Sequence, residues 1–236
     1  MQWARSVYSV IMLVMATTMV AKAQVPVRAM HSKVKDSGQY EAFGVHKKIP
    51  NQIKTQVLTA LSYYPELQDT RIIFRLRKKN TPLSSRPQVI SAFKGMGNRT
   101  YIITISTKTN KKLRPILLAN LPYNAQIGVL GHELAHVVTY ETMRSSQLVQ
   151  LPLKMLNKKF TDSFEFRTDL VCIEHGLGHQ LYDWSSYVRE ALQITEWRGA
   201  SLSTSLDQNE SERQRYMNPD TILSYMNSIP IYNSSQ

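Results

Sequence analysis

The segment GVLGHELAHVV, residues 128–138, constrains this chain more than any other stretch. Its apolar residues recur at helical spacing, and His132 and His136 are four residues apart. Residues four apart project from the same face of a helix, so both imidazoles can reach one metal ion. Glu133 is rotated by about 100° from His132, which puts its carboxylate beside such an ion. We expect a metal-binding helix over residues 122–140; the alternative is a structural helix whose histidines bond to carbonyls.

Two glycines interrupt the same helix. Gly128 lies one turn before His132 on the same face, and Gly131 lies next to it in sequence. Each glycine costs a helix interior roughly 1 kcal/mol relative to alanine. Because a glycine has no side chain, another segment's backbone can approach the helix closely at these positions. We expect such an approach here.

A catalytic metal site needs a third protein ligand. A second stretch with helical spacing, predicted from Asp162 to His179, contains Glu165 and Asp169 four residues apart and therefore on one face. Two carboxylates among apolar neighbours need a positively charged partner. A metal ion could take Glu165 as a ligand while Asp169 accepts the free N–H of a ligand histidine. Pairing of the carboxylates with Arg167 or a nearby lysine is the structural alternative.

The motif HELAH at residues 132–136, followed by EFRTD at residues 165–169, resembles the gluzincin zinc metallopeptidases. It is closest to the group whose third ligand comes from a Glu-x-x-x-Asp helix, and the strand-then-helix lead-in is similar to minimal-scaffold secreted members. The resemblance covers residues 49–178. It implies Zn²⁺ held by His132, His136 and Glu165, with Glu133 as the general base. It also implies an edge strand that lines the substrate cleft.

The chain departs from this family in two respects. The membrane members of the group have spanning helices, which this sequence lacks, and no residue here matches the side chain that stabilises the transition state. Such a side chain would act as an electrophile beside the carbonyl oxygen. The candidates are His175, His179 and Tyr216. The two histidines stand beside Gly176 and Gly178, where the second helix is expected to end, so both could simply be exposed there.

The remaining patterns predict an α+β domain. A helix opens at Pro50 and ends before Pro65, and Arg71–Arg77 alternates apolar residues with arginines, as a half-buried strand does. Val89–Phe93 and Tyr101–Ser106 are two further expected strands. A helix, then strands, then helices indicate a zincin-like fold with a small antiparallel sheet packed on the HExxH helix and the Glu-x-x-x-Asp helix. Tyr101–Ser106 is expected to line the cleft.

The amino terminus has the features of a secretory signal peptide over residues 1–23. Arg5 precedes the apolar run Val7–Val20, and Ala21-Lys22-Ala23 has the small-x-small form of a cleavage site. The run is too short for a bilayer, which needs about 20 residues. We expect cleavage near Ala23 and a periplasmic or extracellular protein; an uncleaved anchor is the alternative. Residues 24–45 are an expected irregular arm, and residues 46–236 a single metallopeptidase domain.

The charge of the chain limits its partners. Its formal net charge is +12, or +10 without the signal peptide, and the basic residues are spread along it. The export signal and the lack of a nucleic-acid-binding module disfavour nucleic acid. The expected partners are a peptide or protein substrate and, at the periphery, anionic surfaces. Cys172 is the only cysteine, so no intrachain disulfide can form, and its neighbours Val171 and Ile173 predict a buried thiol.

One segment keeps two interpretations. Leu148–Phe160 is apolar on more than one face, contains Pro152, and carries Lys154, Lys158 and Lys159. It either covers the back of the metal-binding helices, or it forms a protruding flap whose lysines face anionic lipid or an acidic partner.

Two functions follow from the sequence. The first is an exported zinc-dependent endopeptidase in which a substrate strand adds to the edge of the sheet. The second is a non-catalytic envelope binding protein that uses zinc for stability. Glu133 favours the enzyme, because it is not a ligand and has no evident structural task.

Overall fold

The computed structural model describes residues 27–28, 38–194 and 216–233. The expected signal peptide and most of the expected arm lie outside these ranges, so export stays a prediction. In the part of the arm that is described, Gly38–Gly44 forms the 3-10 helix η1 and buries Tyr40, where we expected irregular chain. No helix among the described residues is long and apolar enough to cross a membrane.

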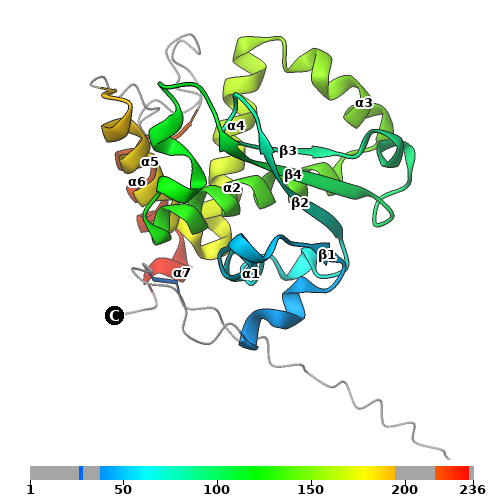
Figure 1. Cartoon of the computed structure of the whole chain (residues 1–236), viewed down its shortest axis with the longest axis horizontal. Coiled ribbons are helices and arrows are strands. Elements are labelled where there is room, and N and C mark those ends of the chain that lie inside the picture. Colours follow the sequence, from blue (N-terminus) through cyan, green and yellow to red (C-terminus); the bar gives the residue numbers. More distant parts are fainter. Residues whose placement is uncertain (1–26, 29–37, 195–215, 234–236) are drawn as a thin grey trace, which may run out of the picture.

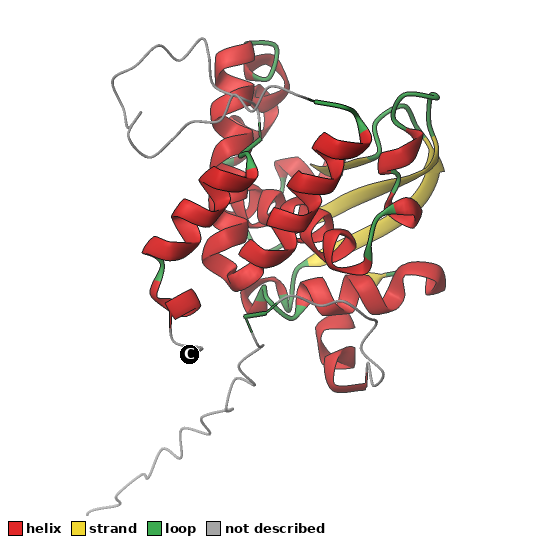
Figure 2. Cartoon of the chain, turned by 90° about the vertical axis from the view of Figure 1, so that its left-hand side faces the viewer, coloured by secondary structure: helices red, strands yellow, loops and turns green. Residues whose placement is uncertain are grey.

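Four strands and seven α-helices, joined by short 3-10 turns, make up the described chain (Figures 1 and 2). The strands are β1 (Lys47–Lys48), β2 (Arg71–Lys78), β3 (Leu83–Pro87) and β4 (Thr100–Lys108). The α-helices are α1 (Lys54–Leu61), α2 (Tyr123–Thr142), α3 (Ser145–Lys154), α4 (Lys158–Cys172), α5 (Gly178–Ala191), α6 (Pro219–Ser228) and α7 (Pro230–Asn233). The 3-10 turns are η2 (Asn51–Ile53), η3 (Pro65–Leu67), η4 (Val89–Phe93), η5 (Arg114–Ile116) and η6 (Leu118–Asn120), and η7 (Ile173–Leu177) is a π-helical turn.

The sheet has the order β1-β2-β4-β3, and only β3 runs antiparallel to its neighbour. The α+β class is confirmed, but the expected antiparallel sheet is wrong, because β1, β2 and β4 are parallel. β4 is not at the edge either. Its run of Tyr101, Ile102 and Ile103 is buried, as suits a central strand covered on both faces. The edges are β1 and β3, and the serines and Pro87 of β3 are typical of an edge strand.

The expected strand Val89–Phe93 is instead the 3-10 turn η4. The β-branched and aromatic residues of this segment are typical of a strand. In the structure, however, a side chain forms hydrogen bonds with the nearby backbone. The Ser91 hydroxyl donates to backbone carbonyls and accepts from the N–H of Thr100 at 3.0 Å. Such side-chain-to-backbone bonds compete with a sheet ladder.

Helix α2 is the centre of the fold, and Figure 1 shows it between the sheet and helices α5 and α6. The predicted close approach of another backbone occurs at Gly128. A methyl group at Gly128 would overlap the backbone carbonyl of Gln180 in α5, whereas one at Gly131 would overlap the side chain of Leu177. Gly128 therefore lets α5 pack backbone-to-backbone against the helix that carries the histidines, and Gly131 makes room for a side chain.

The second predicted helix is divided in two. α4 ends at Cys172, and the π-helical turn η7 follows with Gly176 at φ 88°, so α5 starts in a new direction at Gly178. The glycines thus mark a kink and not the end of helical chain, because a positive φ is accessible to glycine at little steric cost. Cys172 is fully buried, as expected, and burial raises the pKa of its thiol.

The α2–α5 contact yields a stability prediction. Gly128→Ala should lower the free energy of unfolding by about 1–3 kcal/mol or more, because the new methyl group must displace backbone. Gly95→Ala is the matched control, since a methyl group at Gly95 meets nothing within 4 Å. Urea denaturation measures both; equal stabilities for the two variants would contradict the packing described.

Candidate metal centre

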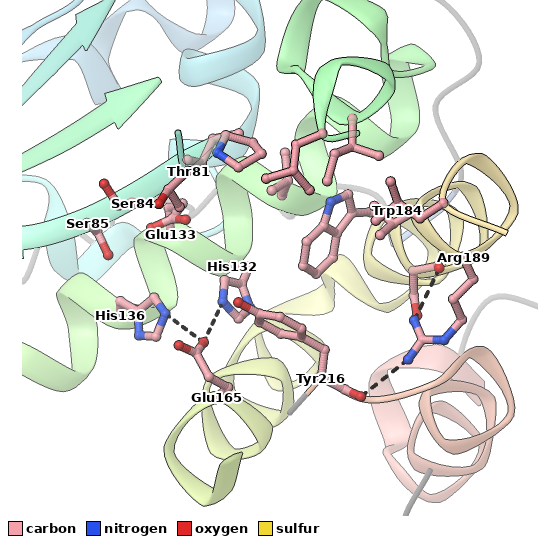
Figure 3. A pocket seen from close by; sticks show the side chains of 18 of the residues that line it. Thr81, Ser84, Ser85, His132, Glu133, His136, Glu165, Trp184, Arg189 and Tyr216 are labelled. Carbon is pink, nitrogen blue, oxygen red and sulfur yellow. Dashed lines mark hydrogen bonds and ion pairs between the residues drawn. The ribbon is translucent and has the colours of Figure 1, made fainter. Parts of the chain in front are cut away.

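Three side chains from two helices meet at one point. His132 and His136 extend from α2, and Glu165 extends toward them from α4 (Figure 3). The Glu165 Oε2 atom lies 3.2 Å from His132 Nε2 and 3.1 Å from His136 Nε2. One potential ligand atom from each residue lies within 4.8 Å of the others, so this group could hold a metal ion.

The other ring nitrogen of each histidine is held by α4. His132 Nδ1 is 2.8 Å from Asp169 Oδ1, and His136 Nδ1 is 3.1 Å from the Thr168 hydroxyl. The Thr168 hydroxyl donates to the Phe164 carbonyl, so it accepts from the imidazole. These contacts place a proton on Nδ1 of each ring and leave both Nε2 atoms facing Glu165.

The carboxylates beside the two histidines favour a cation at this point. Burial lowers the pKa of His132, but hydrogen bonds to Asp169 and Glu165 outweigh burial and raise that pKa to about 10. Burial raises the pKa of Glu165, yet the two imidazoles outweigh it and hold that pKa far below its usual range. A positive charge is therefore stabilised where the Nε2 atoms face Glu165, and a metal ion can supply it.

The partners of the carboxylates exclude the structural alternative for α4. Glu165 and Asp169 both face histidines, whereas Arg167 is exposed on the outside of the helix. Asp169 is 1% exposed and also accepts the N–H of Met217 at 2.7 Å on its second oxygen. It lies behind His132, as the sequence predicted.

Glu133 differs from the other carboxylates of the site. It is buried, and its Oε2 atom has no hydrogen-bond partner among the described residues. It lines the same cavity as His132 and His136. A buried polar atom without a partner is costly, so a water or a ligand group at this position would stabilise it.

The cavity in front of the three side chains has a volume of about 540 Å³. Its floor is α2, one wall is β3 with the residues before it, and the opposite wall is α5 (Figure 3). Much of the remaining lining is apolar. It comes from α2 and from η5 and α5 with the residues next to them, through the side chains of Leu113, Ile116, Val129, Trp184, Val188 and Leu192.

The strand that lines this cavity is β3, not Tyr101–Ser106. Ser106 donates its N–H to the Pro82 carbonyl across the ladder. Because antiparallel pairs alternate, Leu83 and Ser85 turn their own N–H and C=O groups away from β4. The Tyr140 hydroxyl reaches the Ser85 carbonyl at 3.4 Å on this side. The open edge of the sheet therefore borders the cavity.

Only one of the three electrophile candidates lines the cavity. Tyr216 does, with its ring centre 5.6 Å from that of His132. His175 instead bonds to Glu66 at 2.6 Å and to the Val171 carbonyl, and His179 lies beside the ring of Tyr232. Hydrogen bonds from its neighbour hold Tyr216 in place, because Met217 donates its N–H to Asp169 and accepts from the Ser185 hydroxyl.

Some residues of the site were not predicted from the sequence. Thr168 lies inside the EFRTD motif, and a threonine there could have been proposed as a support for the second histidine. Trp184 packs 5.5 Å from His132, centre to centre, but nothing in the sequence links it to the motif. β3 was missed because LSSRP has no strong strand signal.

Comparison of the chain with protein-family models, with curated proteins and with solved structures finds no match. The candidate site therefore stands on its own geometry.

Metal binding is the direct test of this centre. Glu165→Ala removes one of three ligands and should abolish stoichiometric metal binding, measured by elemental analysis after gel filtration. Asp169→Ala should weaken binding by roughly 10- to 100-fold, because Asp169 orients His132 but is not among the potential ligands. Glu174→Ala, an exposed carboxylate on the following turn, is the control and should bind normally. If Glu165→Ala still bound metal and Asp169→Ala did not, the assignment of Glu165 as a ligand and Asp169 as its support would have to be exchanged.

Proposed function

We propose that this protein is an exported zinc-dependent endopeptidase of the gluzincin type. The observation that carries the proposal is Glu133, a buried carboxylate beside the three potential metal ligands; one oxygen of Glu133 has no partner among the described residues. A metal that only stabilised the fold would not need this residue. Export rests on the amino-terminal sequence, and an amino terminus at Gln24 in the native protein would establish it.

The donor set supports zinc. Two imidazoles and one carboxylate are a common ligand set of catalytic zinc, which keeps a fourth position open for water or substrate. When bound, zinc would polarise a peptide carbonyl and acidify a water molecule. The single cysteine of the sequence and the Nδ1 contacts, which leave both Nε2 atoms facing Glu165, suit a site with two nitrogen ligands and one oxygen ligand.

Glu133 acts as the general base in this proposal. It accepts a proton from the attacking water and later delivers it to the nitrogen of the leaving amine. Its position on α2, one residue after His132, keeps the carboxylate beside the ion without making it a ligand. The absence of a hydrogen-bond partner on Oε2 leaves that oxygen available for the proton.

The substrate binds as an additional strand along β3. Leu83 and Ser85 direct main-chain groups toward the open edge, and an extended peptide would pair with them as a β-strand does. The peptide would then cross in front of His132, His136 and Glu133. This replaces the expectation that Tyr101–Ser106 binds the peptide.

Tyr216 is the residue we propose for stabilising the transition state. Its ring lies next to His132, and Figure 3 draws it in front of the potential ligands. Asp169 fixes the adjacent Met217 N–H while also orienting His132, so the two rings are positioned by one carboxylate. A phenol there can donate a hydrogen bond to the developing oxyanion.

Glu133→Gln separates an enzyme from a binding protein. The variant should lose roughly 100- to 10,000-fold in kcat against casein or a peptide library, because amide oxygen is a poor base. It should still bind zinc, since the three ligands are intact. Glu190→Gln, exposed on α5, should keep full activity. Hydrolysis that survived in Glu133→Gln would exclude this mechanism, and an inactive but zinc-loaded wild type would favour the binding protein.

Ser85→Pro tests the strand contact. It removes an outward N–H without breaking the bonds to β4, so kcat/KM should fall up to about tenfold, the value of one hydrogen bond. Ser85→Ala keeps the N–H and should behave like the wild type. Loss of activity in both variants would point to the hydroxyl instead of the main chain.

Tyr216→Phe tests the proposed electrophile. It keeps the ring packing on His132 and removes only the hydroxyl, so kcat should fall roughly 100- to 1000-fold with little change in KM. Steady-state kinetics on one peptide separate the two constants. An unchanged kcat would assign the oxyanion to another group.

A further inference from the structure

Two neighbouring segments expose most of the large apolar side chains that face solvent in the described chain. One is η4 with the turn that follows it, and the other is α3 with the turn at its end. Leu156 is 82% exposed and Ile90 is 78% exposed. We call the whole set the apolar rim; its members are Val89, Ile90, Phe93, Met96, Val149, Leu153 and Leu156.

The two segments form one platform. η4 contacts α3, and Arg99, which is almost fully buried, ties the segments together. Its guanidinium donates to the carbonyls of Lys94 and Met143 and to the Ser145 hydroxyl. These bonds fix the turn after η4 to the start of α3, so the apolar side chains are presented by an ordered surface.

The rim is not a part of the core. α3 packs against the rest of the domain through Leu148 and Leu151, which are buried. Its other apolar residues point outward. α3 thus has one buried and one exposed apolar face, and the contact of its lysines with anionic lipid stays a prediction. Clustered exposed apolar side chains on a folded domain mark a contact site.

The charges around the rim indicate its partner. Residues 80–99 and 142–161 contain no aspartate or glutamate, and they include Arg86, Lys94, Lys154 and Lys158. Glu141, just before the second range, contacts the turn after η4 through the N–H of Gly97, so the basic residues outnumber the carboxylates there. A second copy of this chain would bring the same positive charge to the contact and be repelled. Apolar side chains flanked by cations suit the headgroup region of an anionic bilayer.

We propose that the apolar rim docks this protein on the surface of anionic membranes. η4 follows β3 directly, and Met155, one residue after α3, lines the cavity. Docking would therefore hold the cavity next to the lipid surface, within reach of polypeptides that are attached to the membrane. Figure 1 shows α3 at the margin of the molecule, away from α6 and α7. The proposal does not rest on hydrolysis, because docking needs neither metal nor Glu133.

Vesicle co-sedimentation tests the proposal with purified chain that begins at Gln24. Wild type should bind phosphatidylglycerol vesicles at low salt, bind less at high salt, and leave phosphatidylcholine vesicles largely unbound. Ile90→Ser/Leu153→Ser should lose binding, since both side chains are more than two-thirds exposed and their removal spares the core. Val45→Ser/Leu223→Ser changes two exposed apolar residues elsewhere and should bind like the wild type.

Two variants that each remove three positive charges test the electrostatic part of the proposal. Lys94/Lys154/Lys158→Gln should lower the partition coefficient roughly a hundredfold, at about a fivefold effect per lysine. Lys108/Lys111/Lys112→Gln removes the same charge at the opposite end of β4 and should have a small effect. Equal effects of both variants, no wild-type binding, or a dimer that is lost in Ile90→Ser/Leu153→Ser would each overturn the proposal.

Discussion

Asp169 accepts hydrogen bonds from two segments that are far apart in the sequence, and the candidate site depends on this carboxylate. One oxygen accepts from His132 on α2, and the other accepts from the N–H of Met217, which follows Tyr216. The same side chain thus orients an imidazole of the candidate metal centre and positions the tyrosine beside it. Because Asp169 is almost fully buried, neither bond competes with water.

The sequence predicted those parts of the site that lie within one element. Spacing by four residues placed His132 with His136 and Glu165 with Asp169, because helix geometry determines which residues share a face. The glycines of α2 predicted a close approach, and α5 makes it. Each of these inferences needed only local geometry.

The sequence could not predict what depends on how distant segments pair. Strand order follows from long-range contacts, so β4 was taken for the edge although β3 holds that place. The local pattern of Val89–Phe93 suited a strand, but the Ser91 hydroxyl closes a 3-10 turn there. Tyr216 could not be separated from His175 and His179, because its position is set by a hydrogen bond from the next residue to Asp169.

The cavity and the apolar rim share their supporting elements. β3 lines the cavity and leads into η4. In the sequence, α3 follows the helix of His136 and precedes the helix of Glu165. A surface that docks through η4 and α3 would therefore lie beside the opening to the candidate centre. In the proposed docking, the basic residues of these two segments would have a specific role, because they outnumber the carboxylates there.

X-ray absorption at the zinc edge of the zinc-loaded protein tests the central claim most directly. The account predicts nitrogen and oxygen ligands at about 2.0–2.1 Å, with outer-shell scattering from two imidazoles and no sulfur. Loss of one imidazole contribution in His136→Ala should accompany weaker binding. A spectrum with no imidazole scattering, or with sulfur from Cys172, would contradict a centre built from His132, His136 and Glu165.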